Sequence, residues 1–290
     1  MKVSGFTFIR NALKYDYPIV EAIRSILPLC DEVVVAVGNS EDDTLELVRS
    51  IDPKVRIIET VWDDSLRTGG RVLAEETDKA FAAIAPDADW AFYIQGDEVI
   101  HEKYLDIVRA SMKEHLNNQQ VDGLLFHYEH FYGSYDYVGT SSSWYRNEIR
   151  VIRNNKSIYA YRDAQGFRKG NNEKLRVKRV DAYVYHYGWV KPPEIMQRKQ
   201  EDFPKLWFDD EWVKQNVEAV SEFNYEKHVK SLGPFRGTHP AVMRERIEAS
   251  NWKFDFDPSF ARKSMKDHLK RLAWILLRWD LNYRNYKLLP

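Results

Sequence analysis

A short acidic turn follows one of the most apolar stretches of the chain. Residues 90–94 read WAFYI, and Gln95, Gly96, Asp97 and Glu98 come directly after them. An apolar run without polar alternation predicts a strand that is buried on both faces. The carboxyl end of such a strand lies at the edge where open α/β sheets bind ligands. Carboxylates there suit Mg²⁺ or Mn²⁺, so we expect Asp97 and Glu98 to hold a divalent metal beside a diphosphate. The alternative is that both acids cap the helix expected at 102–112.

Strands and helices alternate ahead of this turn. Apolar runs predict strands at 3–9, 33–37, 55–58 and 90–94, and apolar residues at helical spacing predict a helix in each gap. This alternation is typical of an α/β fold whose sheet is mostly parallel and has helices on both faces. No Gly-x-Gly-x-x-Gly turn follows the first strand, which disfavours a dinucleotide-binding domain and a P-loop.

Four segments carry a resemblance to a known family. They are FIRN at 8–11, DEVVV at 31–35, NSEDDT at 39–44 and IQGDE at 94–98. Their order and spacing resemble the family 2 glycosyltransferases of the GT-A fold, and most closely a bacterial branch whose acidic motif usually reads LDADE. The resemblance extends from residue 1 to about residue 190. It implies a Rossmann-like nucleotide-diphospho-sugar transferase that moves a sugar from a nucleotide-diphosphate donor to a glycan or lipid-linked acceptor, with Mg²⁺ or Mn²⁺.

The resemblance also implies donor-binding residues. Gln95 stands where the family has its first motif Asp, so Asp97 is the expected metal carboxylate, and the Gln95 amide can bind a ribose or a metal-bound water. Arg10, Asn11, Asp42 and Asp43 are expected near the nucleotide, and Arg67 and Arg71 are expected to clamp the diphosphate. The alternatives are helix capping by the two aspartates and a solvated helix start for the two arginines.

The second half of the chain supplies candidates for the base and for further phosphate contacts. Residues 148–154 resemble the RLFRN strand of the family, after which relatives carry a general base. An inverting transfer needs such a carboxylate, and Asp163 is the first candidate and Glu173 the second. The family's late His-Tyr-Gly strand end corresponds to His186, which implies a metal or diphosphate ligand; a histidine buried among aromatic residues is the alternative. Lys191 and Lys199, the latter on a helix expected at 193–203, are expected to contact phosphate.

Two unusual segments flank these candidates. Residues 129–137 and 141–146 are rich in aromatic residues, and we expect a loop in which Tyr132 and Trp144 form an acceptor platform, with packing against C-terminal helices as the alternative. The basic segment 166–179 is expected to be mobile and to close over the diphosphate, or else to be a solvated face.

Residues 1–203 are expected to form the GT-A domain and residues 204–290 a helical C-terminal extension. Its last segment, 261–285, is basic and amphipathic. We expect it to pack on the catalytic domain; a peripheral membrane contact or a homodimer are the alternatives.

Composition excludes some classes of function. The formal net charge is −1 over 290 residues, which argues against a nucleic-acid partner. One cysteine, no recognisable signal peptide and no long apolar run predict a cytoplasmic protein, either free or at the inner face of the membrane. A nucleotidyltransferase is disfavoured because residues 10–13 contain no glycine. A catalytically degenerate protein that binds nucleotide or sugar without turnover remains the alternative to an enzyme.

Overall fold

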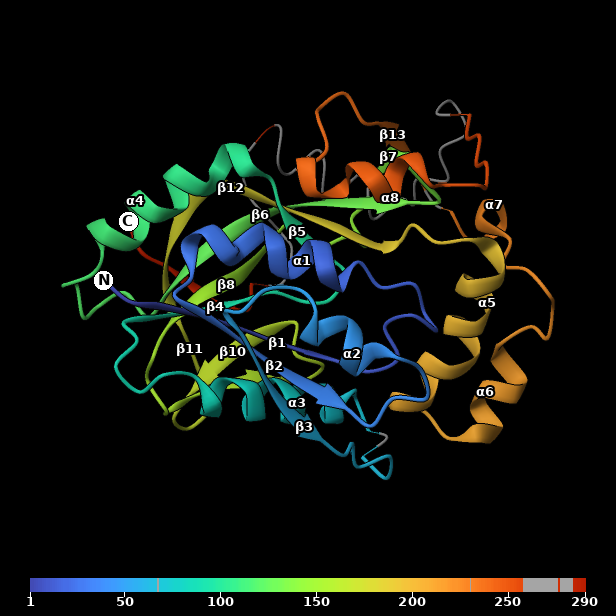
Figure 1. The fold of residues 1–290 in the computed structure, drawn as a ribbon. Coiled ribbons are helices and arrows are strands. Elements are labelled where there is room, and N and C mark those ends of the chain that lie inside the picture. The colour runs from blue at the N-terminus through green and yellow to red at the C-terminus, as the bar shows by residue number, and fades with distance from the viewer. Residues whose placement is uncertain (67, 230, 258–275, 277–283) are drawn as a thin grey trace.

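A computed structural model of the chain describes residues 1–66, 68–229, 231–257, 276 and 284–290 (Figure 1). Arg67 and nearly all of the segment 261–285 therefore lie outside the described residues.

Parallel strands form the N-terminal half of the main sheet, in the order β3 (Val55–Thr60), β2 (Glu32–Gly38), β1 (Val3–Ile9) and β4 (Trp90–Tyr93). Helices α1 (Ile19–Ile26), α2 (Thr44–Arg49) and α3 (Arg71–Ala83) connect them in turn. The predicted alternation of strands and helices in this half is confirmed.

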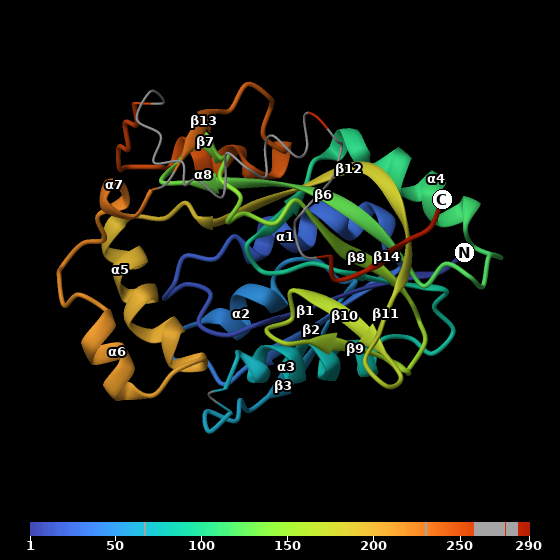
Figure 2. The same ribbon diagram turned by 180° about the vertical axis from the view of Figure 1, so that it is seen from behind.

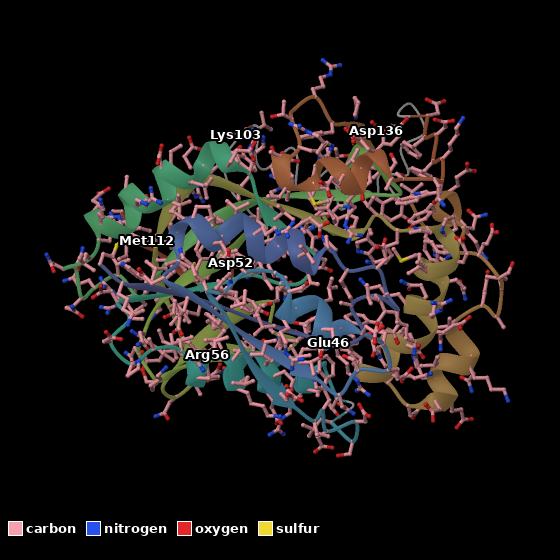
Figure 3. The ribbon with its side chains drawn as sticks, in the orientation of Figure 1. Glu46, Asp52, Arg56, Lys103, Met112 and Asp136 are labelled. Atoms are coloured by element: carbon pink, nitrogen blue, oxygen red, sulfur yellow. The ribbon has the colours of Figure 1, made fainter. Side chains whose placement is uncertain are left out.

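Side chains of β2 alternate between two cores, which explains its nearly pure valine sequence. Val33, Val35 and Val37 pack in the core that contains residues of α1, α2 and α4 (Leu105–Glu114), whereas Val34 and Ala36 pack in the core that contains α3. Met112 of α4 is fully buried in the first core (Figure 3). A strand covered by helices on both faces has no position for a polar side chain.

The second half of the sheet is mixed. Strand β8 (Asn147–Arg153) pairs antiparallel with β4, and β6 (Gly123–Tyr132) pairs antiparallel with β8. The long β12 (Arg176–Trp189) then runs parallel to β6 and antiparallel to β5 (Glu98–Ile100), the strand that follows the acidic turn. A smaller sheet of β9 (Ile158–Tyr161), β10 (Gly166–Lys169) and β11 (Glu173–Lys174) lies on the α3 side (Figure 2). The α/β class, with a curled central sheet flanked by helices, is the one predicted.

Two expectations about loops are wrong. Residues 129–137 form most of a hairpin in which β6 turns at Gly133 (φ +75°) into β7 (Ser134–Gly139). The basic segment 166–179 is built into β10, β11 and the start of β12. Arg168 is only 3% exposed, and its guanidinium donates to the Asn285 carbonyl at 2.7 Å. The hydrophobic pattern does not predict these strands, because many of their side chains are aromatic or basic rather than aliphatic.

The chain after residue 203 contributes to the same sheet. Strand β13 (Leu232–Pro234) pairs with β7, and β14 (Lys287–Leu288) pairs with β12. The domain boundary at residue 203 remains a prediction. The other elements here and earlier are α5 (Pro193–Asp202), α6 (Asp210–Asn216), α7 (Tyr225–His228), α8 (Arg244–Glu248) and the 3₁₀ helices η1 (Leu27–Leu29), η2 (Glu102–Tyr104), η3 (Phe203–Leu206) and η4 (Ala241–Met243). Within the described ranges no helix is long and apolar enough to cross a membrane.

Candidate active site

A cavity of about 810 Å³ opens at the carboxyl ends of the parallel strands. The chain leaving each strand contributes to its lining: Arg10 after β1, Glu41 after β2, Trp62 after β3 and Gln95 after β4. Aromatic side chains from η3 to α6 form a further part of the wall, namely Phe203, Trp207, Phe208 and Trp212. The cavity therefore occupies the edge at which the sequence predicts a site.

Asp97 and His186 meet in this cavity, as the sequence predicts. Residues 98–100 and 184–186 pair antiparallel, and the Tyr187 amide donates to the Asp97 carbonyl at 2.8 Å. The Asp97 Oδ2 atom lies 3.6 Å from His186 Nε2 and 3.9 Å from Lys199 Nζ. A carboxylate, an imidazole and an ammonium group are thus gathered at one point.

His130 fixes the orientation of His186. On the parallel strands β6 and β12 the two histidines are direct neighbours, and their Nδ1 atoms are 3.1 Å apart. His130 Nε2 lies 2.7 Å from the Tyr145 carbonyl, which only accepts, so this nitrogen carries the proton. Burial, followed by the neighbouring His186, lowers the pKa of His130 to about 3, so the ring is neutral and its Nδ1 accepts. His186 must then donate through Nδ1.

This arrangement leaves a specific requirement at Asp97. With Nδ1 of His186 donating to His130, the Nε2 atom of His186 faces the Asp97 carboxylate. Two electron-rich atoms at 3.6 Å need a positive charge between them, either a proton on Nε2 or a metal ion. An oxygen and an imidazole nitrogen are both ordinary ligands of Mn²⁺, so the donor set fits a divalent cation. Among the residues that the structure describes, no group of three or more His, Cys, Asp or Glu side chains could hold a metal.

Positive charge surrounds the Asp97 carboxylate. Burial alone would raise the pKa of Asp97, but His186, Lys199 and Lys191 outweigh burial and hold this pKa well below its usual range. Burial lowers the pKa of Lys199, and Asp97 opposes that change. Burial, together with Lys199, lowers the pKa of Lys191 to about 7, against the opposing effect of Asp16 and Asp97. This end of the cavity is therefore suited to an anion.

The predicted metal ligand Glu98 does not reach the cavity. It is fully buried, and both of its oxygens accept from the fully buried Arg150 at 2.7 Å. The Tyr128 hydroxyl and the backbone N–H of Gln95 also donate to it, at 2.8 and 3.1 Å. With these four contacts Glu98 holds the acidic turn in place, and we withdraw it from the proposed metal ligands.

Gln95, Arg10 and Asn11 line the cavity as predicted, and each also braces a loop. Gln95 Nε2 lies 3.3 Å from the Ala164 carbonyl. The Arg10 guanidinium donates to Asp64 at 2.7 Å, and Asn11 Oδ1 accepts from the Glu41 amide at 2.7 Å.

Several other predicted donor-binding and base residues lie away from the cavity. Asp42 accepts from the backbone amides of Lys14 and of Thr44, the first residue of α2. Asp43 is the N-cap residue of α2, but its side chain makes no capping hydrogen bond, and neither aspartate lines the cavity. Arg71 points outward to Glu75, with its side chain 69% exposed. The Tyr132 hydroxyl donates to the Tyr225 carbonyl in an aromatic cluster, as the packing alternative predicts. Glu173 lies on the short hairpin strand β11 and lines neither this cavity nor the smaller one described next.

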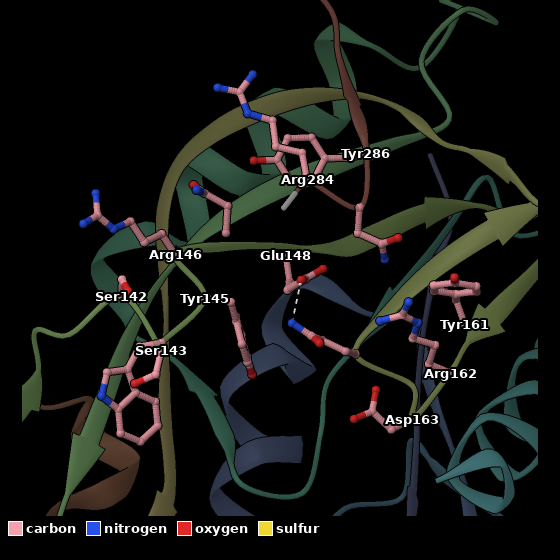
Figure 4. A pocket seen from close by; sticks show the side chains of 14 residues that line it. Ser142, Ser143, Tyr145, Arg146, Glu148, Tyr161, Arg162, Asp163, Arg284 and Tyr286 are labelled. Carbon is pink, nitrogen blue, oxygen red and sulfur yellow. Dashed lines mark hydrogen bonds between the residues drawn. The ribbon is translucent and has the colours of Figure 1, made fainter. Parts of the chain in front are cut away.

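Asp163 lies at the junction of two cavities. A second cavity, of about 280 Å³, adjoins the first, and Figure 4 shows Asp163 among its lining residues. Asp163 and Trp144 line both cavities. The other residues common to both are Ser143, Tyr145 and Gln165. Burial raises the pKa of Asp163 above its usual range, which makes this carboxylate a better proton acceptor. Of the two predicted bases, Asp163 alone has access to the site.

Some residues of the site escaped prediction. His130 could be found only from the pairing of β6 with β12, since nothing in its local sequence marks it. Trp62, Trp207, Phe208 and Trp212 belong to a general excess of aromatic residues that did not indicate which of them line a cavity.

No protein-family model and no curated protein matches the chain. Solved structures do. S. aureus TarS is 16% identical over 74% of this chain and 42% of that chain, with a TM-score of 0.40. TarS 1–349 in complex with UDP-GlcNAc is 15% identical over 74% of this chain and 70% of that chain, with a TM-score of 0.40.

Glucosyl-3-phosphoglycerate synthase from Mycobacterium tuberculosis, in complex with Mn²⁺, UDP and glucosyl-3-phosphoglycerate, is 21% identical over 45% of this chain and 44% of that chain, with a TM-score of 0.29. The chain thus matches less than half of the length of full TarS and of the synthase. At these identities and scores, the function has to be argued from the site itself.

Proposed function

We propose that this chain is a GT-A glycosyltransferase of the family 2 type, which transfers a sugar from a nucleotide-diphosphate donor to an acceptor hydroxyl with inversion. The observation that carries the proposal is the composition of the main cavity. Asp97, His186 and Lys199 gather at the carboxyl ends of parallel strands, while Asp163 lies where the cavity meets a second one. A departing diphosphate needs nearby positive charge, and an acceptor hydroxyl needs a carboxylate that takes its proton.

On the donor side, Asp97 Oδ2 and His186 Nε2 would hold Mg²⁺ or Mn²⁺, and phosphate oxygens and water would complete its coordination. The metal supplies positive charge that stabilises the departing diphosphate. Lys199 adds a second positive charge 3.9 Å from Asp97, and His130 keeps His186 in the tautomer that turns Nε2 to the metal.

On the acceptor side, Asp163 would act as the general base. As the acceptor oxygen attacks the anomeric carbon, the Asp163 carboxylate takes the hydroxyl proton. The bond from the anomeric carbon to the diphosphate oxygen breaks, and its electron pair leaves with the diphosphate. Attack from the side opposite the leaving group inverts the anomeric configuration. The pKa of Asp163, raised by burial, favours this proton transfer.

The test is donor turnover with Mn²⁺ and a panel of UDP-, GDP- and CMP-sugars. We expect nucleotide release from at least one donor. In an Asp163→Asn variant that still binds the nucleotide, the rate of sugar transfer from that donor to the acceptor should fall ~10²- to 10⁴-fold. Glu173→Gln is the matched control and should keep full activity, because Glu173 lies outside both cavities.

Two outcomes would count against the proposal. Nucleotide binding without turnover of any donor would favour the catalytically degenerate alternative. Full metal-dependent activity in an Asp97→Asn variant would refute the assignment of Asp97 as a metal ligand.

A further inference from the structure

One loop of the main cavity is held in an unfavourable backbone conformation. Residues 10–18 connect β1 to α1, and Tyr17 near the end of this loop lines the cavity. Asp16, the residue before it, has a positive φ of 47°, which residues with a side chain rarely adopt. Because such a conformation costs energy, it persists only where the surrounding contacts hold it.

Two cationic side chains from distant parts of the chain hold Asp16. Arg246 lies on α8, next to α1 (Figure 1), and its guanidinium donates to the Asp16 carboxylate and, at 3.0 Å, to Glu21 of α1. The guanidinium also lies 3.5 Å from the Tyr17 carbonyl. The fully buried Lys191 donates to the Asp16 carbonyl at 2.7 Å. The side chain and the backbone of Asp16 are thus held separately, and together they fix the position at which Tyr17 follows.

The Tyr17 ring lies among the positive charges of the cavity. The Nζ atoms of Lys191 and Lys199 lie 4.4 and 5.1 Å from the centroid of this ring. Lys199 Nζ also donates to the Gly188 carbonyl at 3.1 Å and lies 3.9 Å from Asp97 Oδ2. Because an ammonium group is attracted to the face of an aromatic ring, Tyr17 helps to fix Lys199 beside Asp97.

The other end of the loop has its own anchors. The Arg10 guanidinium donates to Asp64 at 2.7 Å, and Asn11 accepts from the Glu41 amide at 2.7 Å and donates its own amide to Ser40 at 3.0 Å. These contacts do not involve α8. A change at Arg246 should therefore disturb the end of the loop at Tyr17 and leave the end at Arg10 in place.

We propose that Arg246 is a positioning residue for binding of the donor diphosphate. It holds Asp16, Asp16 fixes Tyr17, and the Tyr17 ring keeps Lys199 where the diphosphate binds. The assignment of this diphosphate to a nucleotide-sugar rests on the proposed function. Arg246 does not line the cavity, so it affects binding through the loop alone.

The experiment measures the affinity of the full chain for three probes by ligand-observed NMR in the presence of Mg²⁺. The probes are UDP, pyrophosphate and uridine. In the R246Q variant, the affinities for UDP and pyrophosphate should fall ~3- to 30-fold, which is the value of one cation–π contact, and the affinity for uridine should not change. The matched control is R244Q, which removes an exposed arginine of the same helix and should leave all three affinities unchanged.

A second variant protects the test against misfolding of R246Q. D16G removes the carboxylate that Arg246 holds, and glycine adopts a positive φ without strain, so this variant should fold and show the same pattern of affinities. A double-mutant cycle then tests the route. If Arg246 acts through the Tyr17 ring, adding R246Q to a Tyr17→Leu variant should cause no further loss of pyrophosphate affinity.

Three results would overturn the proposal: unchanged pyrophosphate affinity in R246Q and D16G, an equal loss of uridine and pyrophosphate affinity in both, or losses that add up in the double variant. Failure of the proposed function has a separate signature. If the wild-type chain binds pyrophosphate but not UDP, the nucleotide donor is refuted, while the pyrophosphate affinities still decide the role of Arg246. If it binds neither, both proposals are wrong.

Discussion

Replacing Glu98 by Gln separates two roles that the sequence alone could not distinguish. A metal ligand would be dispensable for folding and needed for metal binding. A buried structural acid would have the opposite profile. Glu98 and Arg150 are both fully buried, with two contacts of 2.7 Å between them, so the structure predicts the second profile.

The size of the effect follows from the contacts of Glu98. The substitution removes the negative charge that compensates Arg150. It also replaces one carboxylate oxygen by an NH₂ donor. One oxygen accepts from Tyr128 and Arg150 and the other from the Gln95 backbone and Arg150, so in either orientation the NH₂ group faces two donors. Breaking a buried ion pair by removing one partner lowers the free energy of unfolding by ~3–5 kcal/mol. A typical domain is stable by only ~5–15 kcal/mol, so the loss should be easy to detect.

Urea denaturation at pH 7 measures this loss, with the m-value used to check that unfolding remains cooperative. The matched control is Glu46→Gln. Glu46 pairs with Arg49 on the outer face of α2, where both side chains are more than half exposed (Figure 3), and its removal should leave the midpoint almost unchanged. If E98Q kept the wild-type midpoint but lost Mn²⁺ binding, the assignment of Glu98 to a structural role would be wrong.

Two further predictions concern the cationic end of the cavity. Replacing His130 by Phe removes the acceptor for His186 Nδ1, and the affinity for Mn²⁺ in the presence of UDP should fall ~10- to 100-fold in a calorimetric titration; an unchanged affinity would show that His130 does not orient His186. The pKa of Lys191 is about 7 when folded and 10.5 ordinarily, so the unfolded chain binds more protons between these values, and stability should rise with pH there. Relative to Lys191→Met, the wild-type free energy of unfolding should increase by up to ~2.7 kcal/mol from pH 7 to pH 9. If urea denaturation gives a difference between wild type and variant that does not change with pH, the lowered pKa of Lys191 is contradicted.

Local patterns were sufficient to predict the N-terminal half of the fold. The strand predicted at 3–9 is β1, and the valines at 33–37 lie within β2, because strands covered on both faces are apolar at every position. The edge that carries the site followed from the same reasoning, since the carboxyl ends of parallel strands meet there. Asp97, His186, Asp163, Gln95, Arg10, Asn11, Trp144 and Lys199 all line the main cavity.

The wrong predictions depend on contacts that sequence spacing does not encode. Glu98 is adjacent to Asp97, yet its environment is set by Arg150, 52 residues away. Arg71 was expected to face the diphosphate, but it is the first residue of α3 and turns along the helix to Glu75. Tyr132 lies on an aromatic strand that packs against residues beyond position 220. For Glu98 and Tyr132 a distant partner decides the direction in which the side chain points, whereas for Arg71 a neighbour on the same helix does.

The pairing of β12 shows how the order of the strands creates the site. This strand runs between β5 and β6, so His186 is opposite Glu98 on one side and opposite His130 on the other. The first pairing brings the imidazole to Asp97, and the second fixes its tautomer. A shift of one residue in the register would turn His186 to the other face of the sheet and separate it from Asp97. The acidic turn therefore acquires its second proposed ligand only when the β12 register is correct, which explains why neither motif alone identifies the site.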